Sequence, residues 1–256
     1  MISIDVKQPT PTRRDGQNVA AVQDRLRTAI LHGELEPDSS TSLVDLARAF
    51  GAGRTPLREA LRMLQREGLV IATPNQRVRI ASLTAADFEE ISIARLALET
   101  VAIRITVPTL TSADIAALEG YMAQMEHYQK VGDQVGFRAP HRAFHHTLVA
   151  AAGLRVTAEI SKLADHAERY RLRFGTFGNW DEGRAEHRAI LDAAASGDAT
   201  GAADRLAAHY VQTITLVFGV LDRDHDLNRL RTTIRAVAPG AEAALKDGSS
   251  WPAHQA

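Results

Sequence analysis

The chain has 256 residues, of which 45% are apolar and only 5% aromatic, and it contains no cysteine. This length suits two domains, or one domain with an appended module. The formal net charge of −1 excludes a uniformly basic protein, so any surface for nucleic acid must be local. Without cysteine, the chain can form neither disulfides nor thiolate metal sites.

The first 17 residues, MISIDVKQPTPTRRDGQ, are polar and lack the apolar core of a signal peptide. We expect residues 1–17 to form a flexible arm. No later stretch approaches the roughly 18 uncharged apolar residues that a membrane span needs. A cytoplasmic protein without a membrane partner is therefore expected.

Residues 18–83 begin with the signals of two short helices. Apolar residues recur at helical spacing from Asn18 onward, and the pattern stops at Gly33. After the turn LEPDSS, the segment TSLVDLARAF predicts a second helix, with Thr41 or Ser42 as its N-cap.

A third helix and a hairpin complete this region. Thr55 is expected to cap the helix, with Pro56 at its first position and Gly68 at its end. The segment LVIATPNQRVRIASL alternates apolar residues on both sides of TPNQ, which predicts a two-stranded hairpin. Three helices followed by a small hairpin indicate a winged helix-turn-helix.

The third helix carries an arginine at every fourth position from Arg54 to Arg66. Successive arginines drift only about 40° around the helix, so they share one flank. The leucines of this segment occupy the other flank and are expected to face the core. On an isolated helix such a row would suit a solvated face with i,i+4 ion pairs, but on the third helix of this motif it indicates a DNA-reading edge.

The N-terminal end of this helix is where base edges are reached, so Arg54, Thr55 and Arg58 are expected to contact bases or phosphates. Arg62 and Arg66 lie deeper and are expected to contact phosphate or nothing. Hairpin-tip residues would lie over the minor groove. The predicted DNA-binding residues are Arg54, Thr55, Arg58, Arg62, Gln76 and Arg77.

Residues 84–235 contain six amphipathic segments and almost no strand-like alternation. In the first segment, helical spacing relates Ile91, Leu98, Val101 and Ile105. An all-helical antiparallel bundle is the economical packing for such segments, so the chain is predicted to be mainly α. Residues 236–256 lose periodicity and are expected to form a disordered tail.

Histidines are the second informative feature. His141 and His145 are four residues apart, hence on one face of the third helix of the bundle, while His187 and His209 lie on the fifth and sixth helices. Neutral imidazole is a preferred ligand of zinc, nickel and related metals, and helical bundles build metal sites from facing helices. Each histidine alone would also suit an ordinary surface or core position.

The segment LARAFGAGRTPLREALRMLQREGLVIATPNQRVRIASLT resembles the GntR family of bacterial transcription regulators over nearly all of residues 18–83. The resemblance implies that Arg54 and Arg58 contact the operator and that a homodimer binds a palindromic site in double-stranded DNA. A basic residue that some relatives carry at the start of the second helix is replaced here by Val44, which would change the base preference.

The segments HRAFHHTLVAAAG, EHRAILDAAASGD and LAAHY resemble the ligand-bearing motifs of the FadR-type C-terminal domain. Metal-binding members of that subfamily use one aspartate and three histidines, and those histidines match His145, His187 and His209. The aspartate position holds His141 here. That exchange raises the formal charge of the site by one and favours a nitrogen-preferring ion such as zinc or nickel, or else the ion has been lost.

A cation held by neutral ligands needs an anion, so a small organic acid is the expected effector. Arg95 resembles a family arginine that faces the pocket and is expected to pair with the effector's carboxylate, although a surface position beside Glu99 is the alternative. Together these features predict an effector-responsive transcription regulator, most simply a repressor, and not an enzyme.

Two other functions stay open on the sequence alone, a metal-dependent helical-bundle enzyme and an interaction module without a ligand. HRAFH superficially matches the HExxH pattern of zinc proteases, but Arg142 stands where the general-base glutamate would be required.

Overall fold

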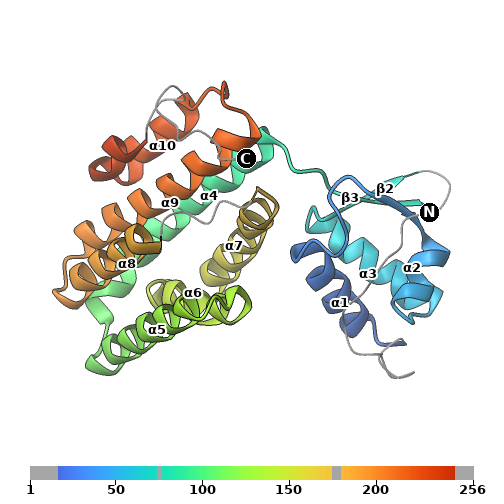
Figure 1. Ribbon diagram of the computed structural model, residues 1–256, viewed down its shortest axis with the longest axis horizontal. Helices are drawn as coiled ribbons and strands as arrows, with labels where there is room; N and C mark the ends of the chain where they lie inside the picture. Colours follow the sequence, from blue (N-terminus) through green and yellow to red (C-terminus); the bar gives the residue numbers. More distant parts are fainter. Residues whose placement is uncertain (1–16, 74–76, 175–179, 246–256) are drawn as a thin grey trace. The chain divides into compact units, whose positions relative to one another are not determined.

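The computed structural model describes residues 17–73, 77–174 and 180–245, and it divides into two compact units between Thr84 and Ala85. Most of the expected arm, residues 1–16, lies outside the described residues, as does Gln76. The elements of the first unit are α1 (Val19–Leu31), β1 (Ser40–Ser42), α2 (Leu43–Ala49), α3 (Arg54–Arg66), β2 (Val70–Thr73) and β3 (Arg77–Ile80) (Figure 1).

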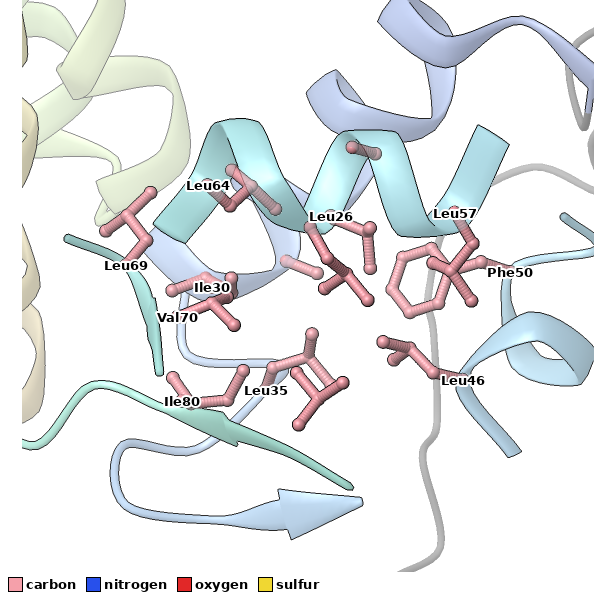
Figure 2. Close-up of a cluster of buried hydrophobic side chains, with 14 of the residues drawn as sticks. Leu26, Ile30, Leu35, Leu46, Phe50, Leu57, Leu64, Leu69, Val70 and Ile80 are labelled. Carbon is pink, nitrogen blue, oxygen red and sulfur yellow. The ribbon is translucent and has the colours of Figure 1, made fainter. Parts of the chain in front are cut away.

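Apolar side chains from the three helices and the sheet meet in one core (Figure 2). Leu26 of α1, Phe50 after α2 and Leu64 of α3 are completely buried in it. All four leucines expected on the inner flank of the third helix are buried, namely Leu57, Leu61, Leu64 and Leu69. Because this flank faces the core, the arginine flank of α3 is left to solvent.

The sheet has a third strand that the sequence pattern did not reveal. β2 and β3 form the expected antiparallel hairpin, and β1 pairs antiparallel with the other edge of β3, where Thr41 lies opposite Val78. The three residues of β1 are serine, threonine and serine, so they offer no apolar alternation from which a strand could be predicted.

One predicted helix cap is confirmed and another is wrong. The Ser42 side chain accepts a hydrogen bond from the backbone N–H of Asp45 and caps α2. Thr55 does not cap α3, because the helix already begins at Arg54 with Gly53 as its N-cap. Pro56 therefore stands third in the helix, where its missing N–H still costs no hydrogen bond.

The second unit is a helical bundle. In the described part of the chain its α-helices are α4 (Ala85–Thr106), α5 (Ser112–Lys130), α6 (Gln134–Thr147), α7 (Leu154–Phe174), α8 (Trp180–Ala195), α9 (Ala199–Leu221) and α10 (Asn228–Val237). Short 3-10 turns are η2 (Val107–Thr109), η3 (Ala150–Ala152) and η4 (Pro239–Ala244). Helix α4 packs against α7, α9 and α10, and α8 packs against α5 and α9 (Figure 1). None of the described helices is long and apolar enough to cross a membrane.

The C-terminal segment departs from the expected disordered tail. Helix α10 begins within the expected bundle and buries Leu230 and Ile234, but the expected tail from residue 236 holds the end of this helix and then η4, with Ala241 and Leu245 buried. The pattern was missed because alanines supply much of the buried surface here, and alanine alone gives a weak periodic signal. Residues 246–256 lie outside the described part of the chain.

The apolar pattern of α4 also differs from the expected one. Val101 and Ile105 are 51% and 48% exposed, whereas Leu96 and Ile103 are completely buried. Helix α4 thus buries one face in the bundle and leaves an apolar pair on another.

Candidate metal centre and DNA-binding surface

Four histidines from three helices converge inside the second unit. Helix α6 contributes His141 and His145, α8 contributes His187, and α9 contributes His209. One ligand nitrogen from each lies within 4.8 Å of the other three. The structure therefore brings together all four residues of the predicted metal site.

The packing of α8 against α5 and α9 positions the middle of this cluster. The Arg188 guanidinium makes two hydrogen bonds to the Glu119 carboxylate, at 2.7 and 2.9 Å, and so joins α8 to α5. His187, the neighbour of Arg188 in sequence, is only 4% exposed and faces the interior. The α8 backbone is thereby held where it presents an imidazole to α6 and α9.

Two of the histidines donate their outer ring N–H to a fixed acceptor. Nδ1 of His187 lies 2.6 Å from the Gly183 carbonyl oxygen, and Nδ1 of His209 lies 2.7 Å from Oε2 of Glu186. An imidazole that donates from Nδ1 keeps an unprotonated Nε2. With Nδ1 protonated, Nε2 of each ring keeps a lone pair that can bind a metal ion. Metal-binding histidines usually donate their other ring N–H to an acceptor in this way.

His145 is held by a longer chain of hydrogen bonds. The Tyr210 hydroxyl donates to the buried carboxylate of Glu99, and its oxygen lies 3.2 Å from Nδ1 of His145. Since the only hydroxyl proton of Tyr210 is used on Glu99, its oxygen accepts from the His145 Nδ1–H. Arg95 anchors the chain by donating to Glu99 at 2.8 Å.

The geometry of His145 and His187 fits a bound cation. Their Nε2 atoms lie 3.2 Å apart, and the outer hydrogen bonds leave a lone pair on each. Two lone pairs at this distance repel unless a positive charge lies between them. Tetrahedral zinc with bonds of about 2.0–2.1 Å separates neighbouring nitrogens by about 3.4 Å, close to the observed spacing.

Burial keeps the cluster uncharged. It lowers the pKa of His187 to about 3 and that of His209 to about 3, and it holds the pKa values of His141 and His145 well below the usual 6.5. The nearby Arg171 guanidinium lowers all four further. Neutral imidazoles keep the lone pair that a metal ion requires, so the cluster need not lose protons before it binds one.

Burial also raises the pKa of Glu186, the acceptor of His209, to about 7. A cation near His209 would favour the ionised carboxylate and with it the tautomer that leaves Nε2 free.

Arg95 does not occupy the surface position that was the alternative for it. Its side chain is 18% exposed, pairs with Glu99 and lies over the Tyr210 ring, 4.2 Å from the ring centroid. Sequence reasoning missed Tyr210, Glu186 and Arg171 as neighbours of the histidines. Tyr210 directly follows His209, yet nothing in that adjacency signals a contact with His145 on another helix.

Apart from Gln76, which lies outside the described residues, the predicted DNA-binding residues are exposed on the first unit. Arg54, Thr55 and Arg58 are exposed, and both arginines lack an ion pair with any described residue. Arg62 is exposed but donates to Glu59 at 2.7 Å. Arg77 at the start of β3 donates to the Ser40 hydroxyl at 3.1 Å. The two arginines nearest the start of α3 are thus available to an anionic ligand, as is Arg66 at the far end of the helix.

Sequence comparison assigns a family to each unit. Residues 18–80 match the family described as bacterial regulatory proteins, gntR family, and residues 90–212 match the FCD domain. An uncharacterized HTH-type regulator from the TAR-I ttuE-ttuC' intergenic region of Agrobacterium vitis is 34% identical over 141 residues, which are 52% of this chain and 80% of the relative. The repressor GlaR of Escherichia coli K12 is 29% identical over 57% of this chain and 69% of its own length. The uncharacterized regulator YdhC of Bacillus subtilis is 32% identical over 40% of this chain, and the match spans 46% of YdhC.

Solved structures show the same fold. E. coli McbR/YncC aligns with a TM-score of 0.68 and 21% identity over 85% of this chain and 98% of its own. A putative GntR regulator from Rhodococcus sp. RHA1 aligns with a TM-score of 0.66 and 21% identity over 78% and 97%. The relatives are regulators, which leaves the enzyme alternative without support. The chain therefore belongs to the GntR family of bacterial transcription regulators, with a DNA-binding winged helix-turn-helix followed by an FCD domain.

Proposed function

We propose that this protein is a cytoplasmic repressor of the FadR subfamily that binds a palindromic operator as a homodimer. A divalent transition metal, zinc or nickel, is held by His141, His145, His187 and His209. A small organic acid that binds at the metal releases the protein from DNA. The observation that carries the proposal is the convergence of four uncharged imidazoles, three of which direct Nε2 inward.

The chemistry of the donor set supports the choice of metal. Four nitrogen ligands suit zinc and nickel and disfavour magnesium or calcium, which prefer oxygen. The bound ion would supply a positive centre to which a carboxylate binds. Arg171 and Arg95 both lower the pKa of His145 and His209, so they add positive potential at the histidines and favour an anionic effector.

The role first expected for Arg95 is modified by its ion pair. Arg95 already pairs with Glu99, so its direct contact with an effector would be weaker than that of an unpaired arginine, although it still lowers the pKa of His145 and of His209. We propose that Arg95 acts on the effector through the electrostatic potential and holds Tyr210 in place.

The exposed apolar side chains of the bundle support a homodimer. Val101 and Ile105 are one turn apart on α4, and Leu154 at the start of the neighbouring α7 is 90% exposed. Exposed apolar side chains on two helices that pack together suit a protein interface. We assign this surface to a second copy of the chain, since a palindromic operator requires two winged domains.

Coupling between effector and DNA requires only that the effector prefer one arrangement of the two domains. The linker at residues 80–86 leads directly into α4, which carries Arg95 and Glu99. A change at the metal that reaches Glu99 through Tyr210 would therefore act on the helix that follows the linker.

A thermal-shift experiment tests the effector half of the proposal. Organic acids, including hydroxy acids, sugar acids and dicarboxylates, are titrated into metal-loaded and chelator-treated protein. An acid that raises the melting temperature of the metal-loaded form alone, and that also weakens binding to an operator selected from random duplexes, supports the proposal. No response across the panel, with DNA binding intact, would favour an interaction module without a ligand.

A further inference from the structure

The four histidines of the cluster are not held alike. His145, His187 and His209 each have a hydrogen-bond partner for Nδ1, supplied by Tyr210, the Gly183 carbonyl and Glu186. His141 makes no hydrogen bond or ion pair with any residue in 17–73, 77–174 and 180–245. Outside the four-histidine cluster, the His141 ring stacks on the Phe137 ring, with 5.4 Å between the ring centroids.

The backbone that carries His141 lacks one helical hydrogen bond. Pro140 lies immediately before it, inside α6, and has no N–H to donate to the carbonyl of Gly136. The turn is nevertheless packed, since Phe137 and Pro140 are buried and Gly136 lies against the Tyr128 ring. One turn later His145 follows the completely buried Phe144, which anchors the helix in the core.

The charge of the site favours exchange of His141 for an anionic ligand. Four imidazoles leave the full +2 charge of a divalent ion uncompensated in a buried site, which is costly. Replacing one neutral imidazole by a carboxylate lowers that charge, whereas replacing an aspartate by a carboxylate would leave it unchanged. Arg171 on α7, although paired with Glu168, still lowers the pKa of His141, so it contributes positive potential that favours an incoming anion.

We infer that His141 is the exchangeable ligand of the site, and that a chelating carboxylate displaces it while His145, His187 and His209 keep the ion. This inference rests on the proposed metal site and specifies how that site responds to its effector. No covalent bond is made or broken beyond the metal's coordination, and the released His141 stays a neutral imidazole.

The test uses the full chain, isotope-labelled at histidine and loaded with zinc, with oxalate as a bidentate carboxylate probe. Nuclear magnetic resonance of the imidazole nitrogens reports which rings bind zinc, and a His141→Ala variant assigns the signal of His141. We expect saturating oxalate to return the His141 signal alone to that of a free imidazole. Retention of all four imidazoles, or release of a different one, overturns the inference.

Zinc affinity, measured by competition with a chromophoric chelator, gives a second readout without oxalate. His141→Ala should lower the zinc affinity least among the four single alanine variants. Each of the other three variants should bind zinc about tenfold or more weakly than His141→Ala does. His146→Ala, an exposed neighbour on the same helix, is the matched control and should leave the affinity unchanged. An equal loss for all four variants contradicts the inference, whereas failure of the wild-type chain to bind zinc would instead refute the proposed metal site.

Discussion

The Tyr210 hydroxyl lies 3.2 Å from Nδ1 of His145 and donates its proton to Glu99, so a histidine of the candidate site on α6 is tied through α9 to α4. Tyr210→Phe removes the acceptor that fixes the tautomer of His145. Metal affinity should fall by about 10- to 100-fold, the usual effect of losing such an outer partner. Competition with a chromophoric chelator measures it.

Tyr121→Phe, on α5, is the control for loss of a tyrosine hydroxyl outside the cluster, and it should leave the affinity at its wild-type value. If Tyr210→Phe binds metal as tightly as the wild type, the hydroxyl does not orient His145.

Arg58→Ala tests the DNA surface. Arg58 is exposed near the start of α3 and has no ion pair with a described residue, so its guanidinium is available to a base edge. A bidentate base contact predicts a loss of about 1–3 kcal/mol in operator affinity, measured by fluorescence anisotropy at fixed salt. Arg66→Ala, at the far end of the same helix, should lose less. An equal loss for Arg58→Ala on random DNA would make its contact one to phosphate.

Val101→Asp tests the dimer surface. A buried, unpaired carboxylate at an apolar interface is costly, so the variant should be monomeric at concentrations where the wild type is dimeric. Sedimentation velocity measures the mass, and circular dichroism checks the fold. Val131→Asp, at the 62% exposed residue that follows α5, is the control. A dimeric Val101→Asp protein would place the interface elsewhere.

The stability of the metal-free protein should depend on pH because the cluster is buried uncharged. Burial lowers the pKa of His187 and His209 to about 3, against 6.5 for the unfolded chain. Below pH 6.5 the unfolded state binds more protons, so the free energy of unfolding falls as pH falls toward the folded-state values. The slope is at most about 1.4 kcal/mol per pH unit for each such histidine.

Urea unfolding of chelator-treated protein between about pH 8 and about pH 5 measures this slope. A His187→Gln, His209→Gln variant should show a shallower dependence, since two of the groups that must be buried neutral are gone. An unchanged slope would mean that the two imidazoles are protonated without cost in the folded state.

The elements with strong periodicity or distinct turn residues were predictable. The arginine flank of α3 and its buried leucines follow from spacing alone, and Ser42 caps α2 as expected. Strand β1 has no apolar residue and exists because β3 offers it an edge, and η4 is buried through alanines; both depend on tertiary packing.

The candidate site was likewise only partly predictable from the sequence. His141 and His145 share a face because of their spacing, the helical pattern placed His187 and His209 on two further helices, and the family resemblance matched His145, His187 and His209 to metal ligands. The outer partners were not predictable, because contacts such as Tyr210 with Glu99 join residues 111 positions apart and depend on how α4 and α9 pack. That His141, unlike the other three histidines, has no Nδ1 partner among the described residues also became visible only in the folded structure.

The metal content of the purified full chain, prepared without a histidine tag and without added metal, tests the central claim most directly. Plasma mass spectrometry should find about one zinc or nickel ion per chain, lost in a His145→Ala, His187→Ala variant and kept in His146→Ala. A chain that carries no metal and takes up none on addition would contradict the account. The four histidines would then be hydrogen-bonding groups of a metal-free pocket.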